Sequence, residues 1–181
     1  MEKSTVFDLR TKSTVIDTRF RVCSITFLER GQDEIVRAIE KRIAEFTFLP
    51  VEHGEGLQVL RFEVGQKFGP HFDFYLNDYN IRNEGQRMVT VVMYLSDVEE
   101  GGDTVFPSAK GIYSDVRWRS AFSECGKRGL SVKPKTGDAL VFWNIKPDGT
   151  SDDSSLHGEC PVIKGTKWTA TKWIHDKEYK E

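Results

Sequence analysis

Apolar residues recur at three- and four-residue steps between Gln32 and Phe46, and charged residues fill most of the positions between them. The apolar set is Ile35, Val36, Ile39, Ile43 and Phe46. This spacing predicts a helix with one apolar face over residues 32–46, because side chains three and four positions apart lie on the same side of an α-helix. Pro50 predicts that the helix ends before that residue.

The rest of the chain alternates short runs of β-branched and aromatic residues with Gly, Asn, Asp and Pro. Such runs are typical of strands bounded by turns. They predict strands at 57–64, 72–76, 88–95, 139–145 and 168–174, and one more at 19–28 before the helix. Many short strands with one early helical layer predict an α+β fold with a mostly antiparallel jelly roll or two-sheet barrel.

Two stretches show no regular pattern: 77–86, which is polar, and 99–129, which is rich in glycine. Loops of this length in a compact domain are usually functional, so we expect both to act as lids over a site. No repeat, low-complexity tract or linker interrupts the chain. We therefore expect residues 1–181 to form a single domain.

The charge balance argues against one class of partner. The chain has 26 Lys and Arg against 28 Asp and Glu, a net charge of −2, and thus lacks the positive field that attracts nucleic acid. No apolar run approaches the ~20 residues that cross a bilayer, and residues 1–9 lack the apolar centre of a signal peptide. We expect neither a nucleic-acid partner nor a membrane-spanning segment.

The three cysteines, Cys23, Cys125 and Cys160, form no CxxC pair. This spacing does not match a structural zinc site. Two interpretations stay open. Either all three are buried or half-buried thiols, or Cys125 and Cys160 form a disulfide with Cys23 free, which requires an oxidising compartment.

Four histidines limit the search for a metal or acid–base site, and three of them stand two positions before an acid. Residues i and i+2 of a strand project from the same face, so a strand can aim both side chains at one ion. Only His71 and Asp73 lie in such a segment, either as metal ligands or as a buried pair. His53 and His175 lie among polar residues and are expected to face solvent.

His157 follows the polar loop 148–155, which comes after the predicted strand 139–145, and is therefore expected at the mouth of a strand. Two imidazoles and one carboxylate leave three open positions on an octahedral ion, the arrangement of non-haem Fe(II) oxygenases. His71, Asp73 and His157 are the candidates. In the alternatives, His157 is a hydrogen-bonded loop residue, or Glu159 supplies a rival carboxylate.

Lys167 precedes the predicted strand 168–174, ten positions after His157. A buried cation there suits the distal carboxylate of a 2-oxo diacid that chelates the metal through its other end. Thr90 and Thr169 offer hydroxyl donors to the same ligand. In the alternative interpretation, Lys167 is solvated and the two threonines are ordinary strand residues.

A resemblance to a known family runs through four segments: GEGLQVLRFEVGQKFGPHFDFY, GQRMVTVVMYLSDVEEGGDTVFP, SECGKRGLSVKPKTGDALVFW and SLHGECPVIKGTKWTATKWIH. Together with QDEIVRAIEKRIAEFTFLP upstream, they resemble the catalytic domain of prolyl 4-hydroxylases, Fe(II)- and 2-oxoglutarate-dependent dioxygenases, of the plant and algal type. The resemblance implies a double-stranded β-helix (jelly-roll) core with N-terminal helices packed on one sheet. It also implies His71, Asp73 and His157 as iron ligands, and Lys167 as the partner of the distal 2-oxoglutarate carboxylate.

The same resemblance implies further residues of a co-substrate pocket. Thr90 matches a family position near 2-oxoglutarate, and Trp173 lies in a typical KW-I/M-H ending; Thr169 joins them as a candidate from its strand position. Phe62 stands where the family usually has Tyr, which removes a hydroxyl. Because one lost hydrogen bond costs about 0.5–1.5 kcal/mol, we expect weaker co-substrate binding.

Substrate contacts are expected from aromatic residues and one arginine. Phe68 replaces a Tyr at a family position linked to the peptide substrate, and Arg21, in RVCSITFL, resembles an arginine near the substrate groove. Tyr75, Trp118 and Trp143 are aromatic candidates for gripping a polyproline helix.

The resemblance implies a reaction: hydroxylation of peptidyl proline at C4 with Fe(II), 2-oxoglutarate and O2, yielding succinate and CO2, with ascorbate as a helper. The expected partner is a proline-rich polypeptide, the expected state a monomer, and the expected location the lumen of the endoplasmic reticulum or Golgi, with the cytoplasm as the alternative. Other interpretations are an oxygenase with a non-prolyl substrate, a non-catalytic jelly roll that binds peptide or sugar, and, least favoured, a zinc hydrolase.

Overall fold

In the computed structural model, which describes residues 1–3, 6–8, 13–15, 21–109 and 120–180, helix α1 occupies Glu34–Thr47. The Asp33 side chain accepts a hydrogen bond from the Val36 N–H and caps the first turn. The helix ends at Phe48, which has a left-handed φ of 59°, two residues before Pro50. The helix predicted at 32–46 is therefore confirmed.

The larger sheet has six antiparallel strands in the order β1-β5-β6-β15-β8-β12. Their bounds are Glu2–Lys3 (β1), Ser24–Leu28 (β5), Leu57–Phe62 (β6), Lys167–His175 (β15), Arg87–Tyr94 (β8) and Ala139–Trp143 (β12). Strands β6, β8, β12 and β15 confirm the strands predicted at 57–64, 88–95, 139–145 and 168–174. Only their ends differ, as is usual for sequence-based boundaries.

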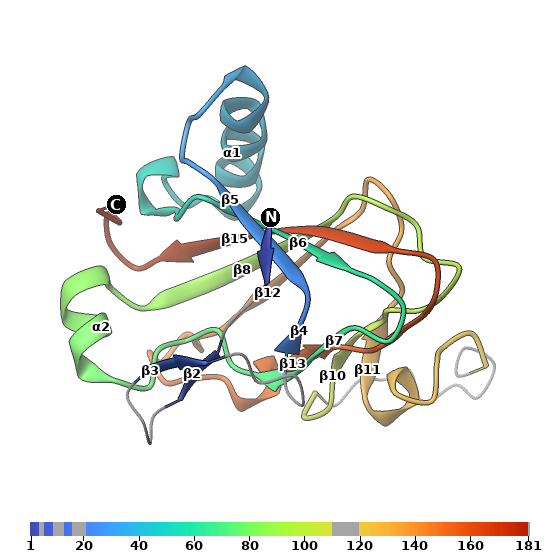
Figure 1. Cartoon of the computed structure of the whole chain (residues 1–181). Helices are drawn as coiled ribbons and strands as arrows, with labels where there is room; N and C mark the ends of the chain where they lie inside the picture. Colours follow the sequence, from blue (N-terminus) through green and yellow to red (C-terminus); the bar gives the residue numbers. More distant parts are fainter. Residues whose placement is uncertain (4–5, 9–12, 16–20, 110–119, 181) are drawn as a thin grey trace.

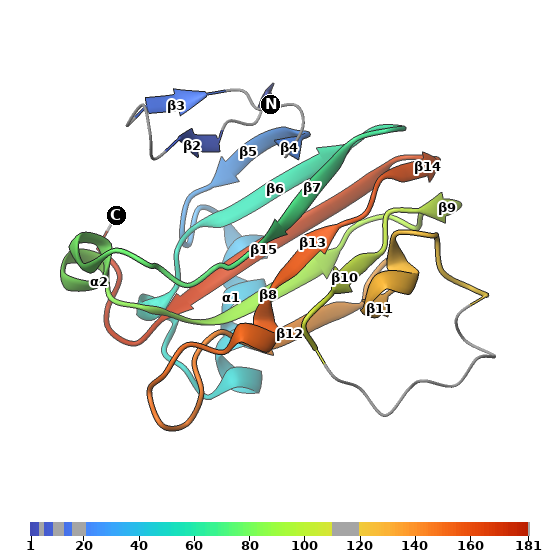
Figure 2. The ribbon, with the colours of Figure 1, turned by 90° about the horizontal axis from the view of Figure 1, so that it is seen from below.

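The smaller sheet has five antiparallel strands in the order β11-β10-β13-β7-β4 and lies in front of the larger one in Figure 2. Their bounds are Leu130–Val132 (β11), Thr104–Phe106 (β10), His157–Glu159 (β13), Lys67–His71 (β7) and Arg21–Val22 (β4). Two facing antiparallel sheets confirm the predicted jelly roll.

The remaining elements are short. Two two-stranded sheets pair β2 with β3 and β9 with β14. The bounds are Val6–Asp8 (β2), Ser13–Val15 (β3), Glu100–Gly101 (β9) and Val162–Lys164 (β14), with 3₁₀ turns at Val51–His53, Gly126–Arg128 and Asp153–Ser155. No helix in the described ranges is long and apolar enough to span a bilayer.

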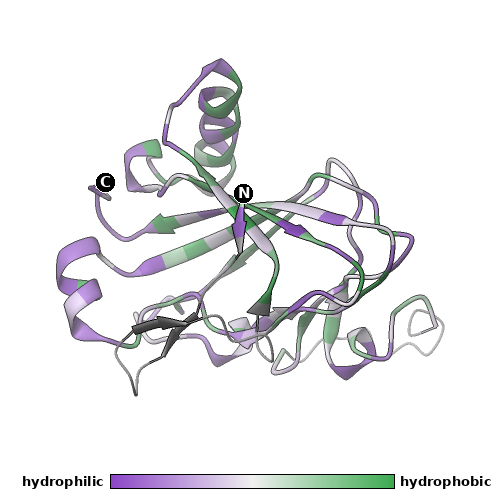
Figure 3. Ribbon diagram, viewed as in Figure 1, coloured by the Kyte–Doolittle hydropathy of each residue, from purple (hydrophilic) through white to green (hydrophobic). Residues whose placement is uncertain are grey.

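Side-chain alternation along β8 and β15 gives the larger sheet two different faces. Val89, Val91 and Ile174 form one apolar cluster, against which Ile43 of α1 packs, and Figure 1 shows α1 over this outer face. Figure 3 shows hydrophilic and hydrophobic bands along α1, as expected for a helix with one buried side. A second cluster of buried residues contains Cys23, Leu60, Phe62, Val98 and Val162.

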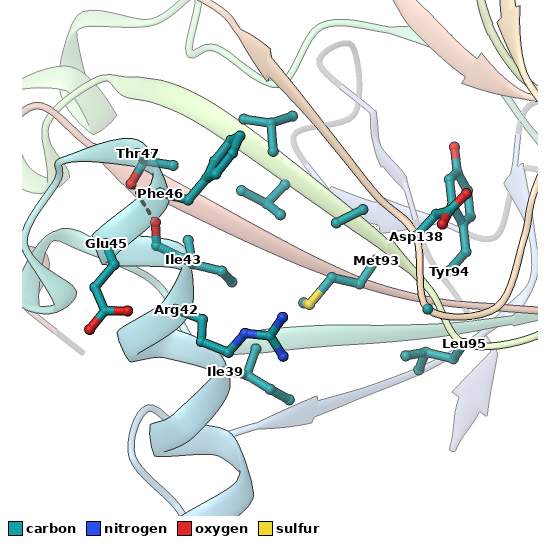
Figure 4. Close-up of a pocket in the computed structure, with 14 residues that line it drawn as sticks. Ile39, Arg42, Ile43, Glu45, Phe46, Thr47, Met93, Tyr94, Leu95 and Asp138 are labelled. Carbon is teal, nitrogen blue, oxygen red and sulfur yellow. Dashed lines mark hydrogen bonds between the residues drawn. The ribbon is translucent and has the colours of Figure 1, made fainter.

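A pocket of about 620 Å³ lies between α1 and the outer face of β8 and β12 (Figure 4). Ile39, Ile43 and Phe46 line it from the helix, and Met93 and Val141 line it from the sheet. Among the described residues that line it there is no predicted iron ligand or co-substrate residue. The predicted iron ligands and co-substrate residues therefore lie elsewhere in the fold.

The strand predicted at 72–76 is wrong, because β7 occupies Lys67–His71 and ends where the prediction begins. His71 pairs with His157, the first residue of β13, and the residues before His157 form a 3₁₀ turn. Past His71 the chain thus has no strand to pair with, and it bends. Asp73 lies in this bend rather than on the strand.

Three other predictions need correction. The irregular stretch predicted at 77–86 contains helix α2 (Asp78–Glu84), which Asn77 caps by accepting a hydrogen bond from the Asn80 N–H. The strand predicted at 19–28 is split at Cys23 into β4 and β5, which belong to different sheets. The loop predicted at 99–129 contains β9, β10 and a 3₁₀ turn, and residues 110–119 lie outside the described ranges.

Candidate metal centre

Three side chains from the facing ends of β7 and β13 converge between the two sheets. His71 ends β7, His157 begins β13, and Asp73 lies in the bend after β7; their ligand atoms all lie within 4.8 Å of one another. The Asp73 carboxylate faces both rings, with Oδ1 3.4 Å from His71 Nε2 and Oδ2 3.5 Å from His157 Nε2. The structure thus brings together the three ligands predicted from the sequence.

Backbone carbonyls orient both imidazoles. His71 Nδ1 lies 2.9 Å from the Gly69 carbonyl oxygen, and His157 Nδ1 lies 2.9 Å from that of Ser155. A carbonyl only accepts, so Nδ1 carries the proton in each ring, and the Nε2 lone pairs point at the shared space beside Asp73. This second hydrogen bond is how proteins fix a metal-binding histidine.

Asp73 is held in its ionised form. Its Oδ2 accepts a 2.7 Å hydrogen bond from Thr90 Oγ1, which in turn accepts one of 2.8 Å from Asn144 Nδ2. Burial raises the pKa of the Asp73 carboxyl, but the neighbouring His157 and His71 imidazoles outweigh burial and keep this pKa well below its usual value. Thr90, predicted near the co-substrate, contacts this ligand.

The pKa of His157 is lowered by burial, which the Asp73 charge only partly offsets. A neutral imidazole and an ionised carboxylate are the forms that bind a divalent cation. Two nitrogens and one oxygen on one side of an ion suit Fe(II) with open coordination positions. The donor set therefore fits the metal that the sequence pattern implied.

Aromatic rings enclose the two histidines. The Phe68 ring stacks on His71 with centroids 3.8 Å apart and planes at 14°. Phe142 and Phe106 lie against His157, with centroid distances of 4.7 and 5.7 Å. Phe68, predicted to touch the peptide, therefore packs on a ligand. The apolar walls lower the local dielectric and strengthen electrostatic interactions at the ligands.

The other predicted substrate residues are dispersed. Arg21 lies on β4 opposite Phe68 of β7. Tyr75 donates a 2.6 Å hydrogen bond to Glu84 of α2, and Trp143, half exposed, ends β12 beside Asn144. Trp118 lies outside the described residues.

Lys167 begins β15 and is completely buried, which excludes the solvated alternative. Its Nζ forms an ion pair with Glu159 Oε2 and donates to the Gly102 carbonyl oxygen at 2.5 Å. Thr104 Oγ1 donates to Glu159 Oε2 at 2.9 Å. Glu159, the rival carboxylate of the sequence analysis, is thus committed to Lys167 rather than to the histidines. The Phe62 ring lies 5.9 Å from Nζ and offers no hydroxyl.

Buried polar atoms without a hydrogen-bond partner occur near these residues. Within the described ranges they include Thr169 Oγ1, Trp173 Nε1 and Asn144 Oδ1. Thr169 and Trp173 alternate on β15 with the same facing as Lys167, and Asn144 contacts Thr90. Because an unpaired buried polar group costs about 1–3 kcal/mol, these atoms are suited to a polar ligand held between the metal cluster and Lys167.

Sequence reasoning missed a charged cluster behind the metal ligands, and its expectation that His175 is exposed is wrong. His175 is completely buried, with Nε2 2.8 Å from Glu55 Oε1. Arg87 binds the same carboxylate through Nε at 2.6 Å and Nη2 at 3.0 Å, and its Nη1 lies 3.5 Å from the Asp73 carbonyl oxygen. The burial of His175 could have been predicted from the alternation of side chains along 167–175, because His175 faces the same side of the strand as Lys167.

Two other open points are settled. Cys125 and Cys160 form a disulfide, with Cα atoms 5.7 Å apart, and Cys23 is a buried free thiol. His53, expected to face solvent, is partly buried, with Nδ1 3.1 Å from the His175 carbonyl oxygen.

The chain is similar to plant proteins along nearly its whole length. It is 65% identical over 181 residues to probable prolyl 4-hydroxylase 10 of Arabidopsis thaliana, and 59% identical over 180 residues to prolyl 4-hydroxylase 5 of the same plant. Each alignment covers 99% of this chain and 62% of the relative. The chain thus spans about 62% of the length of these curated relatives.

Among solved structures, the chain is similar to the viral collagen prolyl hydroxylase of Paramecium Bursaria Chlorella virus-1 in complex with 2OG. The TM-score is 0.66 with 29% identity, covering 86% of this chain and 79% of that one. A prolyl hydroxylase of Trichoplax adhaerens, in complex with a hypoxia inducible factor peptide, matches with a TM-score of 0.60 over 96% of this chain and 70% of its own. At 17% identity that likeness supports the fold alone.

Residues 57–175 match the family model of the 2OG-Fe(II) oxygenase superfamily. The matched segment is most of the chain, and it contains His71, Asp73, His157 and Lys167. Sequence, fold and the converging ligand set agree, and the chain belongs to the 2OG-Fe(II) oxygenase superfamily.

Proposed function

We propose that this chain is the catalytic part of a prolyl 4-hydroxylase that hydroxylates peptidyl proline in proline-rich polypeptides. The observation that carries the proposal is the convergence of His71, Asp73 and His157, with both imidazoles oriented by carbonyls. The 59–65% identity to plant prolyl 4-hydroxylases supports the choice of substrate class. A non-prolyl substrate is the alternative, and the experiment below separates the two.

Each group of residues around the candidate metal centre has its own role in the proposed reaction. His71, Asp73 and His157 would hold Fe(II), which, when bound with 2-oxoglutarate, supplies the oxidising power to insert one atom of O2 at proline C4 while the other enters succinate, with release of CO2. The aromatic rings around the histidines exclude water from this reaction. Thr90 and Asn144 orient the Asp73 carboxylate.

Exposed apolar side chains follow the bend that holds Asp73 and suit a proline-rich peptide. Leu76, two residues before α2, and Tyr79, within α2, are mostly exposed. A polyproline helix presents rigid rings without ordered backbone donors, and it binds to aromatic surfaces with little entropy cost. These residues are the surface on which we propose that the substrate docks.

The disulfide supports an oxidising location. We propose that the protein works in the lumen of the secretory pathway, because the Cys125–Cys160 bond does not persist in a reducing cytosol. Ascorbate is the reductant we propose for keeping iron ferrous. Omitting ascorbate should shorten the linear phase of product formation.

The test is hydroxylation of synthetic peptides. Poly-proline, collagen-like and Ser/Ala-Pro peptides are incubated with Fe(II), 2-oxoglutarate and O2, and the mass gain of one oxygen atom and the release of succinate are measured together. Asp73→Ala should form no product, whereas Asp97→Ala, at an exposed aspartate that accepts from the Thr136 N–H, should match the wild type. Equal product in Asp73→Ala would contradict the metal site, and a product on a non-prolyl residue alone would contradict the substrate.

A further inference from the structure

Lys167 already has all its partners within the protein. It is completely buried, and its ammonium contacts the Glu159 carboxylate, the Gly102 carbonyl oxygen at 2.5 Å and Thr104 Oγ1 at 3.5 Å. An ammonium has three donors, so these contacts satisfy it. In the part of the chain that the structure describes, Lys167 and Glu159 form their ion pair only with each other.

Strand β13 explains why Glu159 reaches this position. His157 and Glu159 are two residues apart on the strand, and both are buried, with Glu159 opposite Thr104 of β10 in the register. The strand that presents a metal ligand therefore also directs a carboxylate toward the lysine. Glu159 accepts from Lys167 and from Thr104, the contacts that the far carboxylate of a bound 2-oxo diacid requires.

The net charge of the Lys167–Glu159 pair disfavours a second carboxylate beside Lys167. With Glu159 in place, the buried lysine is neutralised, and an incoming carboxylate would bring two anions to one cation in a low-dielectric interior. Phe62, against the same ammonium, contributes a ring and no further donor. The distal carboxylate of a 2-oxo diacid can form an ion pair with Lys167 only when the Glu159 carboxylate moves away from it.

We propose that Glu159 is an internal competitor of the co-substrate: its carboxylate occupies Lys167, and 2-oxoglutarate must displace it. This inference rests on the proposed function. It makes Glu159 a residue that sets co-substrate affinity and specificity. The ion pair between the distal carboxylate and Lys167 adds little to the binding free energy, because it replaces the Lys167–Glu159 pair. We therefore expect 2-oxo acids with and without the distal carboxylate to bind with similar affinity.

The test is calorimetric titration of the Mn(II)-loaded protein with two ligands. One is 2-oxoglutarate; the other is 2-oxopentanoate, which has the same chain length and no distal carboxylate. Glu159→Gln removes the competing charge and nearly preserves the shape of the side chain. We expect its Kd for 2-oxoglutarate to fall about ten- to a hundredfold, with Kd for 2-oxopentanoate within about twofold of the wild type.

Glu40→Gln is the matched control, because Glu40 also forms a buried ion pair, with Lys172 on the opposite face of β15. It should leave both dissociation constants unchanged. A Kd for 2-oxoglutarate that stays within twofold in Glu159→Gln overturns the inference, as does an equal gain for both acids. If Glu159→Gln does not fold, the wild type decides: a preference for 2-oxoglutarate above about a hundredfold overturns the inference.

The two proposals fail in different ways. Equal 2-oxoglutarate binding by wild type and Glu159→Gln, with peptide hydroxylation intact, removes only the role of Glu159. If neither 2-oxo acid binds to the Mn(II)-loaded wild type or to Mn(II)-loaded Glu159→Gln, the proposed function and this inference are both wrong.

Discussion

Strand β15 carries two buried lysines on opposite faces of the six-stranded sheet, and each is paired with a glutamate. Lys167 meets Glu159 between the two sheets, and Lys172 Nζ meets Glu40 Oε1 at 2.5 Å under α1. Glu40 also accepts from the Gly31 N–H at 3.0 Å. The chemistry of the two pairs is the same, and only their surroundings differ.

The surroundings determine what each pair can do. The Lys172–Glu40 pair joins a helix to a sheet beside an apolar cluster, and a Cβ at Gly54 would lie 2.4 Å from Lys172 Cε, so this space is filled by the chain. The Lys167–Glu159 pair shares its face of β15 with the unpartnered Thr169 hydroxyl and Trp173 N–H. The outer pair is structural, whereas a ligand can compete for the inner one.

The largest difference should come from removing each lysine. Lys167→Met and Lys172→Met each leave a buried carboxylate unpaired, so each should lower the free energy of unfolding by about 3–5 kcal/mol in urea titrations. Only Lys167→Met should weaken 2-oxoglutarate binding to the Mn(II) protein, because the unpaired Glu159 carboxylate then repels the distal carboxylate of the ligand. Equal loss of binding in both variants would remove the distinction between the pairs.

If either variant does not fold, the paired replacements Lys167→Met/Glu159→Leu and Lys172→Met/Glu40→Leu provide the control. Replacing both members of a buried ion pair by apolar side chains is often neutral or stabilising. Both double variants should therefore fold, and the difference in 2-oxoglutarate binding should persist.

Reduction of the disulfide should have the next largest effect. Cys160 directly follows Glu159, and its bond to Cys125 anchors the end of β13. Reduction, or Cys125→Ser, should lower the free energy of unfolding by about 2–4 kcal/mol. Hydrogen exchange should quicken at residues 157–160 and stay unchanged in α1. Equal loss of protection in α1 would show that both pairs depend on this bond.

Glu55 is a third buried carboxylate, and it has two partners, Arg87 and His175, instead of one lysine. Burial raises the pKa of Glu55, but the hydrogen bond from His175 and the charge of Arg87 outweigh it and bring this pKa below 4.5. A lowered folded-state pKa stabilises the protein at higher pH, and that stability is lost as the pH falls below 4.5 through the folded value. Glu55→Gln should cost about 1.5–3 kcal/mol at pH 7 and flatten this acid loss in urea titrations. An unchanged slope would contradict the assignment.

The smallest effect is expected at the surface. Lys164 and Glu99 form an ion pair of 2.6 Å with both side chains mostly exposed. Solvent and salt screen such pairs, so Glu99→Gln should change neither the urea midpoint nor 2-oxoglutarate binding measurably. A clear loss of either would mean that burial is not what separates Lys164 from the two buried lysines.

Local patterns predicted helix α1 and four strands of the larger sheet. The apolar spacing from Ile35 to Phe46 is regular enough to define α1, and alternation of β-branched residues defines β6, β8, β12 and β15. Helix α2 was missed although Asn77 and Gly85 bound it with the usual capping residues, because its turns carry no apolar period. The strand expected at 72–76 failed because its would-be partner forms a 3₁₀ turn.

The candidate ligands were predicted from residue type and from a strand expected to carry both His71 and Asp73, and only the residue types agree with the structure, because Asp73 lies in a bend. Two histidines and an aspartate are the residue types that an Fe(II) site needs, and few histidines were available to choose from. The role of Glu159 stayed open, because position in the chain does not tell which cation a carboxylate will reach. His175 was misjudged because its charged neighbours in sequence are not its neighbours in space.

Residue type and local spacing were enough to predict the helix α1, the main strands of the larger sheet, the candidate metal ligands and the family. Only the packed structure shows that Glu159 pairs with Lys167, that Glu55 binds both Arg87 and His175, and that Cys125 bonds to Cys160. Each of these contacts joins different segments of the chain. Strand register and burial set their distances, and those arise only when the whole chain has packed.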